Sequence, residues 1–344
     1  MEGYPGYKLA ADGPHLAVAY SDDAGVMRFG VIDVESESIV TAIAPGGPAY
    51  PFSIRRTADG WEVLWVTGGL PGIDRWSSTT EFVDRTPFGA PAGPVLPDVG
   101  EVTATRFGFA TVLRGDSPEV DPFWLATYST AGMVLGPIHV PEELYAPAVL
   151  EYSGSIQSLG DDTVVLMPRA SSPSEIVTLI VSVSDLASSE RATNAAVFAR
   201  SPIAEQPQHG LHSTGSELVI GESPTSDWSS GGLRFVWLDS SFAPLGEWQM
   251  AASPGVFGYS AGAAGAFPRQ ALLAMGTQGG TADDGSLYFG LASGVAEVPN
   301  GMSVVANGVA LDRDRLVWES GSRRYSVAFW RSGLEILTFD CEVP

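Results

Sequence analysis

Short hydrophobic runs that end on Asp or Ser and then lead into a second hydrophobic run recur seven times along the chain. The turn residues are separated by 51, 45, 56, 54, 54 and 39 residues. They are Asp33, Asp84, Ser129, Asp185, Asp239, Ser293 and Ser332. A repeat of about 50 residues whose units consist of short strands is typical of a β-propeller, in which each repeat forms one blade. The pattern therefore predicts an all-β fold, a seven-bladed β-propeller of four-stranded antiparallel blades.

Seven units cover the 344 residues, and we expect one domain because closed all-β folds commonly reach this length as a single unit. The predicted blades are roughly 5–48, 50–97, 100–141, 147–202, 206–253, 257–301 and 302–344. The fifth unit has the clearest strands, predicted at 208–213, 217–221, 233–238 and 246–250 from the inner to the outer position. We expect the ring to close by packing whole blades, with the first inner strand beginning near Tyr7.

In the fifth unit, the third strand at 233–238 is rich in aromatic and β-branched residues, as a strand packed between blades should be, and the other units fit the same frame. Second strands are predicted at 16–20, 61–66, 109–113, 163–167, 271–275 and 316–318. Third strands are predicted at 28–32, 79–83, 123–128, 176–184, 286–292 and 325–331. No capped stretch of helical period reaches ten residues, so we expect very little helix.

Two segments carry a resemblance to a known class of protein. They are 123–137, FWLATYSTAGMVLGP, and 235–246, FVWLDSSFAPLG. Both resemble degenerate blades of the repeat propellers found in exported and lipoprotein-type proteins of high-GC bacteria. The resemblance implies a binding protein that is secreted, periplasmic or attached to the cell surface and has lost its leader; a cytoplasmic protein is the alternative. It transfers no functional residue.

The net charge and the number of cysteines limit the classes of partner and of metal site that the chain could have. The net charge of −22 repels phosphate backbones and anionic lipid, so nucleic acid is not an expected partner. No window approaches 18 uninterrupted apolar residues, which argues against a transmembrane segment. The single cysteine, Cys341, cannot form an internal disulfide or a multi-cysteine zinc site. We therefore expect a monomer without metal or cofactor.

Aromatic residues recur where the chain passes from an outer strand to the next inner strand. Loops on this face of a propeller converge, so a ring of aromatic side chains there could bind a protein, a peptide or a glycan. The candidates are Tyr4, Tyr7, Tyr50, Tyr145, His209, Phe257 and Tyr259. The alternative is that these side chains only plug the channel and anchor the strands. We expect Asp33, Asp84, Asp185 and Asp239 on the opposite face.

A propeller hydrolase of the sialidase or glycosidase type, or a lyase, is the competing hypothesis. Segments 21–25 and 281–288 resemble the Asp-box turn of sialidase-type propellers, and Arg55 and Arg56 resemble an arginine-bearing segment of those enzymes. The remaining arginines and the nucleophile of that class cannot be placed in this sequence. His209 and His212 are predicted to point to opposite faces of a strand, so they do not form a metal pair. The sequence predicts a binding module with no catalytic residue assigned.

Overall fold

The computed structural model describes residues 7–91, 101–114, 123–152, 155–205, 208–223, 233–250, 259–264, 270–277, 285–292, 303–309 and 314–340. Throughout these segments the secondary structure is antiparallel β-sheet, with one short 3-10 turn at Glu142–Leu144. The all-β prediction is therefore confirmed.

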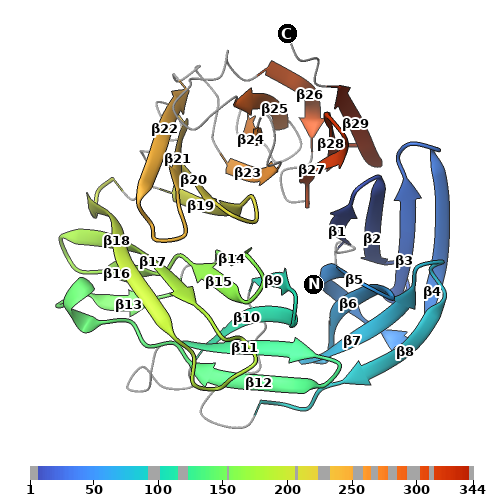
Figure 1. Ribbon diagram of the computed structural model, residues 1–344, viewed down its shortest axis with the longest axis horizontal. Helices are drawn as coiled ribbons and strands as arrows, with labels where there is room; N and C mark the ends of the chain where they lie inside the picture. Colours follow the sequence, from blue (N-terminus) through green and yellow to red (C-terminus); the bar gives the residue numbers. More distant parts are fainter. Residues whose placement is uncertain are drawn as a thin grey trace. The chain divides into compact units, whose positions relative to one another are not determined.

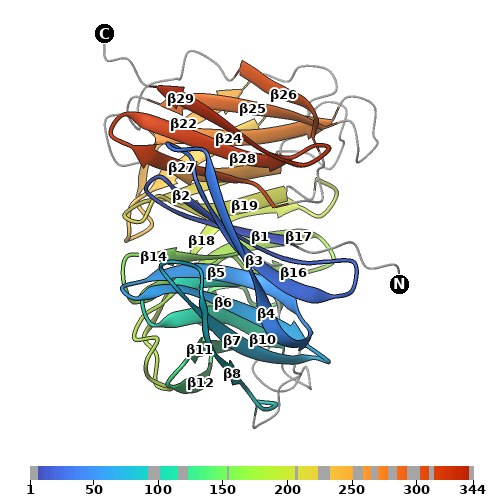
Figure 2. The same cartoon turned by 90° about the vertical axis from the view of Figure 1, so that its right-hand side faces the viewer.

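The first three sheets contain four strands each, in chain order from the inner to the outer position. The first is β1 (Tyr7–Asp12), β2 (His15–Ser21), β3 (Val26–Asp33) and β4 (Ser38–Pro48). The second is β5 (Tyr50–Thr57), β6 (Gly60–Thr67), β7 (Leu70–Ser77) and β8 (Phe82–Pro87). The third is β9 (Val102–Thr105), β10 (Gly108–Arg114), β11 (Phe123–Ser129) and β12 (Gly132–Pro137). Figure 2 shows β5 to β8 following one another in that order.

The later sheets are less uniform. The fourth has six strands: β13 (Val149–Glu151), β14 (Ile156–Leu159), β15 (Thr163–Leu166), β16 (Arg169–Ser171), β17 (Glu175–Val183) and β18 (Thr193–Pro202). The fifth is β19 (Gln208–Ser213), β20 (Leu218–Ser223), β21 (Leu233–Leu238) and β22 (Pro244–Met250). The sixth is β23 (Tyr259–Ala264), β24 (Gln270–Thr277), β25 (Gly285–Ala292) and β26 (Ser303–Val309). The last is β27 (Leu316–Gly321), β28 (Arg324–Trp330) and β29 (Leu334–Asp340).

The chain divides into two units, and Figure 1 labels the strands of both. The first comprises Met1–Glu142, Leu150–Pro168 and Val181–Ala195, and the second Glu143–Val149, Arg169–Ile180 and Ala196–Pro344. Within the first unit the inner strands β1, β5, β9 and β14 lie beside one another in sequence, and within the second β19, β23 and β27 do so. This succession of inner strands is the arrangement of propeller blades.

Six complete blades are present in the described part of the chain, not the predicted seven. Five sheets have four strands and one has six, whereas the last has only three. The prediction counted residues from 302 onward as the start of the last unit, but β26 pairs with β25 and completes the sixth sheet. β1 pairs with β2 in the first sheet, so the first described strand does not complete the last sheet.

The predicted turn positions are right in five of the six cases that the structure describes, and one of the five is Ser332, which lies between β28 and β29. Asp33 and Asp239 lie at turns between a third and an outer strand, where each carboxylate accepts backbone N–H hydrogen bonds. Asp185 follows β17 in a turn, and Ser129 begins the turn to β12, with its hydroxyl donating to the carbonyl of Gly132. Such Asx and Ser turns explain why these residue types end the strands.

Asp84 is the exception, because the second blade was divided at the wrong place. The predicted third strand at 79–83 overlaps the outer strand β8, and the actual third strand is β7. The missed signal is Gly68 and Gly69, whose φ angles of +55° and +82° form a two-residue hairpin turn between β6 and β7. Asp84 therefore lies within β8 and pairs with Arg75.

Aromatic packing holds the first two sheets together. Phe29 of β3 stacks on Trp76 of β7 with ring centroids 5.0 Å apart, and Trp61 and Trp65 join the same buried cluster. Burying each of these side chains contributes about 1.5–3 kcal/mol to folding.

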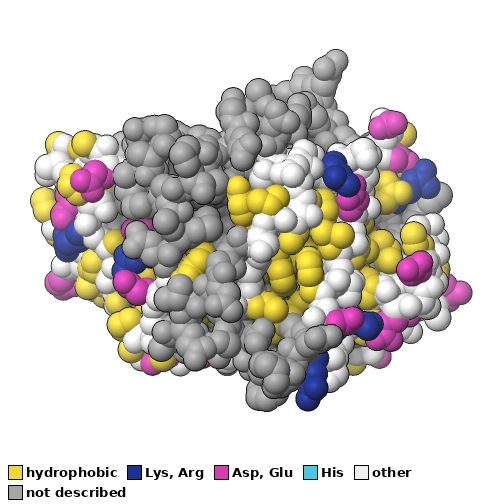
Figure 3. Space-filling view, turned by 90° about the horizontal axis from the view of Figure 1, so that it is seen from above, with side chains coloured by type: hydrophobic (Ala, Val, Ile, Leu, Met, Phe, Trp, Pro, Cys, Tyr) yellow, Lys and Arg dark blue, Asp and Glu magenta, His cyan; other side chains and the backbone are white. Residues whose placement is uncertain are grey.

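The surface carries carboxylates beside arginines, as seen on one side of the molecule in Figure 3.

Candidate functional site

One end of the first two sheets exposes large apolar side chains. At this end β5 begins with Tyr50, which is 49% exposed, and β6 turns into β7 at Leu70, which is 41% exposed. The register pairs Tyr50 with Val66, next to the Thr67–Leu70 pair, so Tyr50 and Leu70 lie about two strand spacings apart, roughly 10 Å. We call this the Tyr50 end of the sheets.

Two hydrogen bonds fix the backbone immediately before Tyr50. The Ala49 N–H donates to the carbonyl oxygen of Gly25 at 3.0 Å, and the Ser21 hydroxyl donates to the carbonyl oxygen of Ala49 at 2.5 Å. Ser21 and Ala49 are each 1% exposed. The β2–β3 turn of the first sheet therefore positions the first residue of the second sheet's inner strand, and the Tyr50 ring is presented from a pinned backbone.

Asp22 shapes the β2–β3 turn itself. One carboxylate oxygen accepts the N–H groups of Ala24 and Val26 at 3.0 and 2.9 Å, while the other pairs with Arg28 at 2.6 Å. The hydrogen bond from Arg28 is the main cause that lowers the pKa of Asp22. In the segment that resembles an Asp-box, the turn contacts therefore come from Asp22.

Tyr20 belongs to the same end and was missed by the sequence analysis. It is 36% exposed and precedes Ser21, which contacts Ala49. Leu70 was missed as well. Their positions in the blade could have identified both residues. Each lies beside the connection between a second and a third strand, and this connection lies at the same end of the sheet as the start of the inner strand. The Tyr50 end thus exposes two tyrosines and one leucine.

The other predicted aromatic residues differ in exposure. Tyr7 pairs in register with Tyr20 but is only 6% exposed. Tyr145 is half-buried and belongs to the second unit. Tyr4, Phe257 and the side chain of Tyr259 lie outside the described residues. The expectation of partly exposed rings does not hold for Tyr7, which contributes to the core, and ligand binding by the remaining candidates stays a prediction.

His209 is buried inside the second unit, contrary to its expected place on an exposed rim. Its side chain is 2% exposed, its Nε2 lies 3.2 Å from Glu222, and its Nδ1 lies 3.4 Å from the Thr178 hydroxyl. Arg234 pairs with Glu222 at 2.9 Å and continues to Glu247 at 2.6 Å. The hydrogen bond from His209 is the main cause that lowers the pKa of Glu222. His209 is therefore part of a buried polar network and is closed to a ligand.

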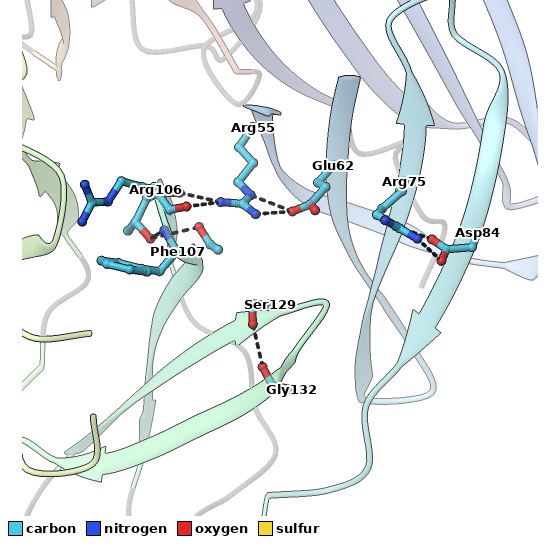
Figure 4. Close-up of polar contacts among 10 residues, drawn as sticks. Arg55, Glu62, Arg75, Asp84, Arg106, Phe107, Ser129 and Gly132 are labelled. Atoms are coloured by element: carbon cyan, nitrogen blue, oxygen red, sulfur yellow. Dashed lines mark hydrogen bonds and ion pairs between the residues drawn. The ribbon is translucent and has the colours of Figure 1, made fainter. Parts of the chain in front are cut away.

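Arg55 is likewise engaged inside the protein. Figure 4 shows its guanidinium between Glu62 and the carbonyl oxygen of Arg106. The Arg55–Glu62 ion pair measures 2.6 Å, its side chains are 12% and 7% exposed, and Arg55 also donates to the Thr105 carbonyl at 2.9 Å. An arginine that binds a substrate carboxylate needs free donors facing a pocket, whereas Arg55 links the second sheet to the third. The resemblance of this segment to the arginine-bearing segment of sialidases is therefore not accompanied by an Arg55 guanidinium that faces a ligand.

Arg55 begins a row of alternating charges that crosses the second sheet. Cross-strand register places Arg55, Glu62, Arg75 and Asp84 opposite one another on four successive strands. Arg75 and Asp84 form an ion pair at the exposed end of the row (Figure 4). The row lies toward the end opposite Tyr50, where Arg56 pairs with Asp12 at 3.1 Å and stacks over Trp61. These charges are neutralised within the protein and serve its structure.

The described segments contain no group of three or more His, Cys, Asp or Glu side chains that could hold a metal ion. Within the same segments, no helix is long and apolar enough to cross a membrane. Cys341 lies outside them.

No family model matches this sequence, and no curated protein matches it. Solved structures do. The β-propeller domain of the Trilobed protease from Pyrococcus furiosus, which has an open velcro topology, matches with a TM-score of 0.53 and 10% identity over 99% of this chain and 97% of its own. Prolyl oligopeptidase B from Galerina marginata matches with a TM-score of 0.56 and 11% identity over 98% of this chain and 49% of its own.

A prolyl endopeptidase gives a TM-score of 0.53 at 7% identity, over 98% of this chain and 48% of its own. This chain thus spans about half the length of the prolyl peptidases it matches. At such low identity the likeness extends to the fold and not to activity. The chain is a β-propeller of four-stranded antiparallel blades, and some of the propellers it resembles belong to hydrolases.

Proposed function

We propose that this protein is a non-catalytic binding module that holds a protein or peptide segment at the Tyr50 end. The observation that carries the proposal is the exposure of Tyr50 from a backbone fixed by Ser21 and Gly25. A tyrosine ring presents contact area and a polar tip at low entropic cost, which suits it to binding interfaces. Tyr20 and Leu70 extend the apolar area on the same end.

The polar networks support binding rather than catalysis. A catalytic acid or base needs an accessible carboxylate or imidazole whose proton can reach a substrate. Glu62 and Glu222 are instead buried beside arginines, and His209 is enclosed by Thr178 and Glu222. In this proposal these groups hold strands together, and the apolar end contacts the ligand.

A paired screen tests the proposal. The intact protein is applied to immobilised peptide and glycan arrays, and in parallel to chromogenic peptide and glycoside substrates, because some neighbouring folds belong to peptidases. We expect saturable binding on the peptide array and no turnover. Turnover by the wild-type protein would contradict the proposal, and binding restricted to glycans would replace the peptide by a carbohydrate. Export of the protein from the cytoplasm stays a separate prediction, and fractionation of the producing cells tests it.

A further inference from the structure

The sequence contains three asparagines, and two of them precede a glycine. They are Asn194, Asn300 and Asn307. Asn307 and Gly308 lie in β26, the outer strand of the sixth sheet, and Figure 2 shows β26 beside β25. Asparagine is a thermolabile residue in proteins. A following glycine increases this lability, because no side chain hinders the backbone nitrogen that attacks the side-chain amide.

Gly308 lies at an irregularity of the ladder between β25 and β26. Ser286 pairs in register with Asn307 and Gly285 pairs with Val309, so Gly308 is an additional residue without a register partner on β25. Its φ angle of +70° lies in the left-handed region, which glycine adopts without strain. The backbone that follows the Asn307 side chain is therefore bulged out of the regular ladder.

A buried hydroxyl group contacts the Asn307 side chain. Ser286 Oγ donates a hydrogen bond to Asn307 Oδ1 at 2.8 Å. Ser286 is 5% exposed and is also hydrogen-bonded to the side chain of Tyr288, whereas Asn307 is exposed. Oδ1 is the atom that gains negative charge when a nitrogen attacks Cγ of the amide. A fixed donor at this distance stabilises that charge, as the donors of an oxyanion hole do.

We propose that Asn307 is a self-modification site, at which the chain converts asparagine to aspartate and isoaspartate without an enzyme. The Gly308 nitrogen loses its proton to hydroxide and attacks Cγ of Asn307. The Cγ–Nδ2 bond breaks, and the nitrogen takes up a proton from water and leaves as ammonia. Water then opens the resulting succinimide at either carbonyl and leaves a carboxylate. Ser286 stabilises the negative charge on Oδ1 in the first step.

The conversion acts on the core through the two neighbouring residues. Ala306 and Val309 lie on either side of the Asn307–Gly308 pair, and both are buried in one cluster with Leu287 of β25 and Val327 of β28. Isoaspartate places an additional carbon atom in the backbone between them, so both side chains can no longer occupy their places. The modification therefore lowers stability with time, an effect that is separate from binding at the Tyr50 end.

The test follows each asparagine separately. The intact protein is incubated at neutral and mildly alkaline pH, and tandem mass spectrometry of digested samples measures conversion at Asn194, Asn300 and Asn307. We expect first-order conversion at Asn307 that accelerates as the pH rises, because hydroxide removes the proton from the attacking nitrogen. Asn194, which is exposed and precedes alanine, is the internal reference and should stay unconverted. Conversion of Asn307 in denaturant but not in the folded protein would overturn the proposal.

Variants test the role of the hydroxyl group. Ser286→Ala and Ser286→Cys remove or weaken the donor to Oδ1, and we expect the rate at Asn307 to fall about threefold or more in the folded protein. Ser303→Ala removes an exposed hydroxyl from the same strand and should leave the rate unchanged. Thermal unfolding identifies the variants that fold, and the cysteine variant serves if the alanine variant does not.

Denaturant provides the second control. The hydrogen bond between Ser286 and Asn307 is lost on unfolding, so wild type and the Ser286 variants should convert at equal rates in denaturant. An unchanged or faster rate at Asn307 in a folded Ser286 variant would overturn the proposal, and so would an equal slowing of that rate in denaturant. We also expect the converted protein, separated by ion exchange, to melt at a lower temperature than the unconverted protein. Equal melting temperatures would contradict the effect on the core.

Discussion

The Ser21 hydroxyl donates a 2.5 Å hydrogen bond to the carbonyl oxygen of Ala49, and so joins the second strand of the first blade to the residue before Tyr50. Both residues are buried. The bond crosses from one sheet to the next, so it fixes where the inner strand of the second blade begins. The exposed ring of Tyr50 depends on this contact for its position.

Removing the Ser21 hydroxyl should therefore destabilise the protein. Ser21→Ala leaves the buried Ala49 carbonyl without this donor, and we expect a loss of about 1–3 kcal/mol in the free energy of unfolding. Ser36→Ala, which removes an exposed hydroxyl, is the control and should change stability by less than about 0.5 kcal/mol. Chemical denaturation measures both values. Equal effects would mean that the Ser21 contact does not hold the two sheets.

The Arg55–Glu62 pair should show strong coupling because both partners are buried. Arg55→Met alone leaves Glu62 uncompensated and should cost about 3–5 kcal/mol, whereas the double variant with Glu62→Met should lose much less than the sum of the single variants. A double-mutant cycle in denaturant measures the coupling.

The exposed Arg75–Asp84 pair provides the comparison within the same row. Its side chains are each 43% exposed, and the corresponding alanine cycle should give a coupling of about 0–1 kcal/mol. Similar coupling energies in the two cycles would contradict the conclusion that Arg55 serves as a buried link between sheets.

Glu222 should make stability depend on pH. Its pKa in the folded protein lies below the ordinary value of 4.5, first because His209 hydrogen-bonds to it. A depressed pKa means that Glu222 contributes stability above its unfolded pKa and loses that contribution as the pH falls through its folded pKa. The stability difference between wild type and Glu222→Gln should therefore be largest near neutral pH and shrink below about pH 4.3.

Denaturant unfolding from pH 7 to pH 3 measures this difference. Glu247→Gln removes a carboxylate of the same network whose side chain is 64% exposed, and it is the control for the loss of one charge beside Arg234. A Glu222→Gln effect that is constant over this range would show that the His209 network does not favour the ionised carboxylate.

Local patterns predicted strands well where turns bounded them clearly. The predicted ranges 208–213 and 233–238 coincide with β19 and β21. Turn residues flank both ranges, and aromatic and β-branched residues fill the second. The second blade was misread because the two-residue turn at Gly68 and Gly69 was not recognised, so the third strand was predicted at 79–83 and β7 was left unassigned. β26 was assigned to the wrong sheet because strand pairing, unlike strand formation, depends on distant partners.

The candidate site was predictable in part. Tyr50 was found from its position before an inner strand, and the structure exposes it. His209 was expected at an equivalent position, but burial and its partners Thr178 and Glu222 depend on strands remote in the sequence. The partners of Arg55 in the third blade could not be predicted for the same reason, since they are tertiary contacts.

The most direct measurement is the affinity of the wild-type protein and of Tyr50→Ala for a peptide selected on the array. Tyr50 is half exposed, so we expect the variant to keep its fold and melting temperature while the dissociation constant rises about tenfold or more. Val83→Ala removes a side chain that is 54% exposed on β8 of the same blade and should leave the affinity unchanged. Equal affinities of wild type and Tyr50→Ala would contradict binding at the Tyr50 end.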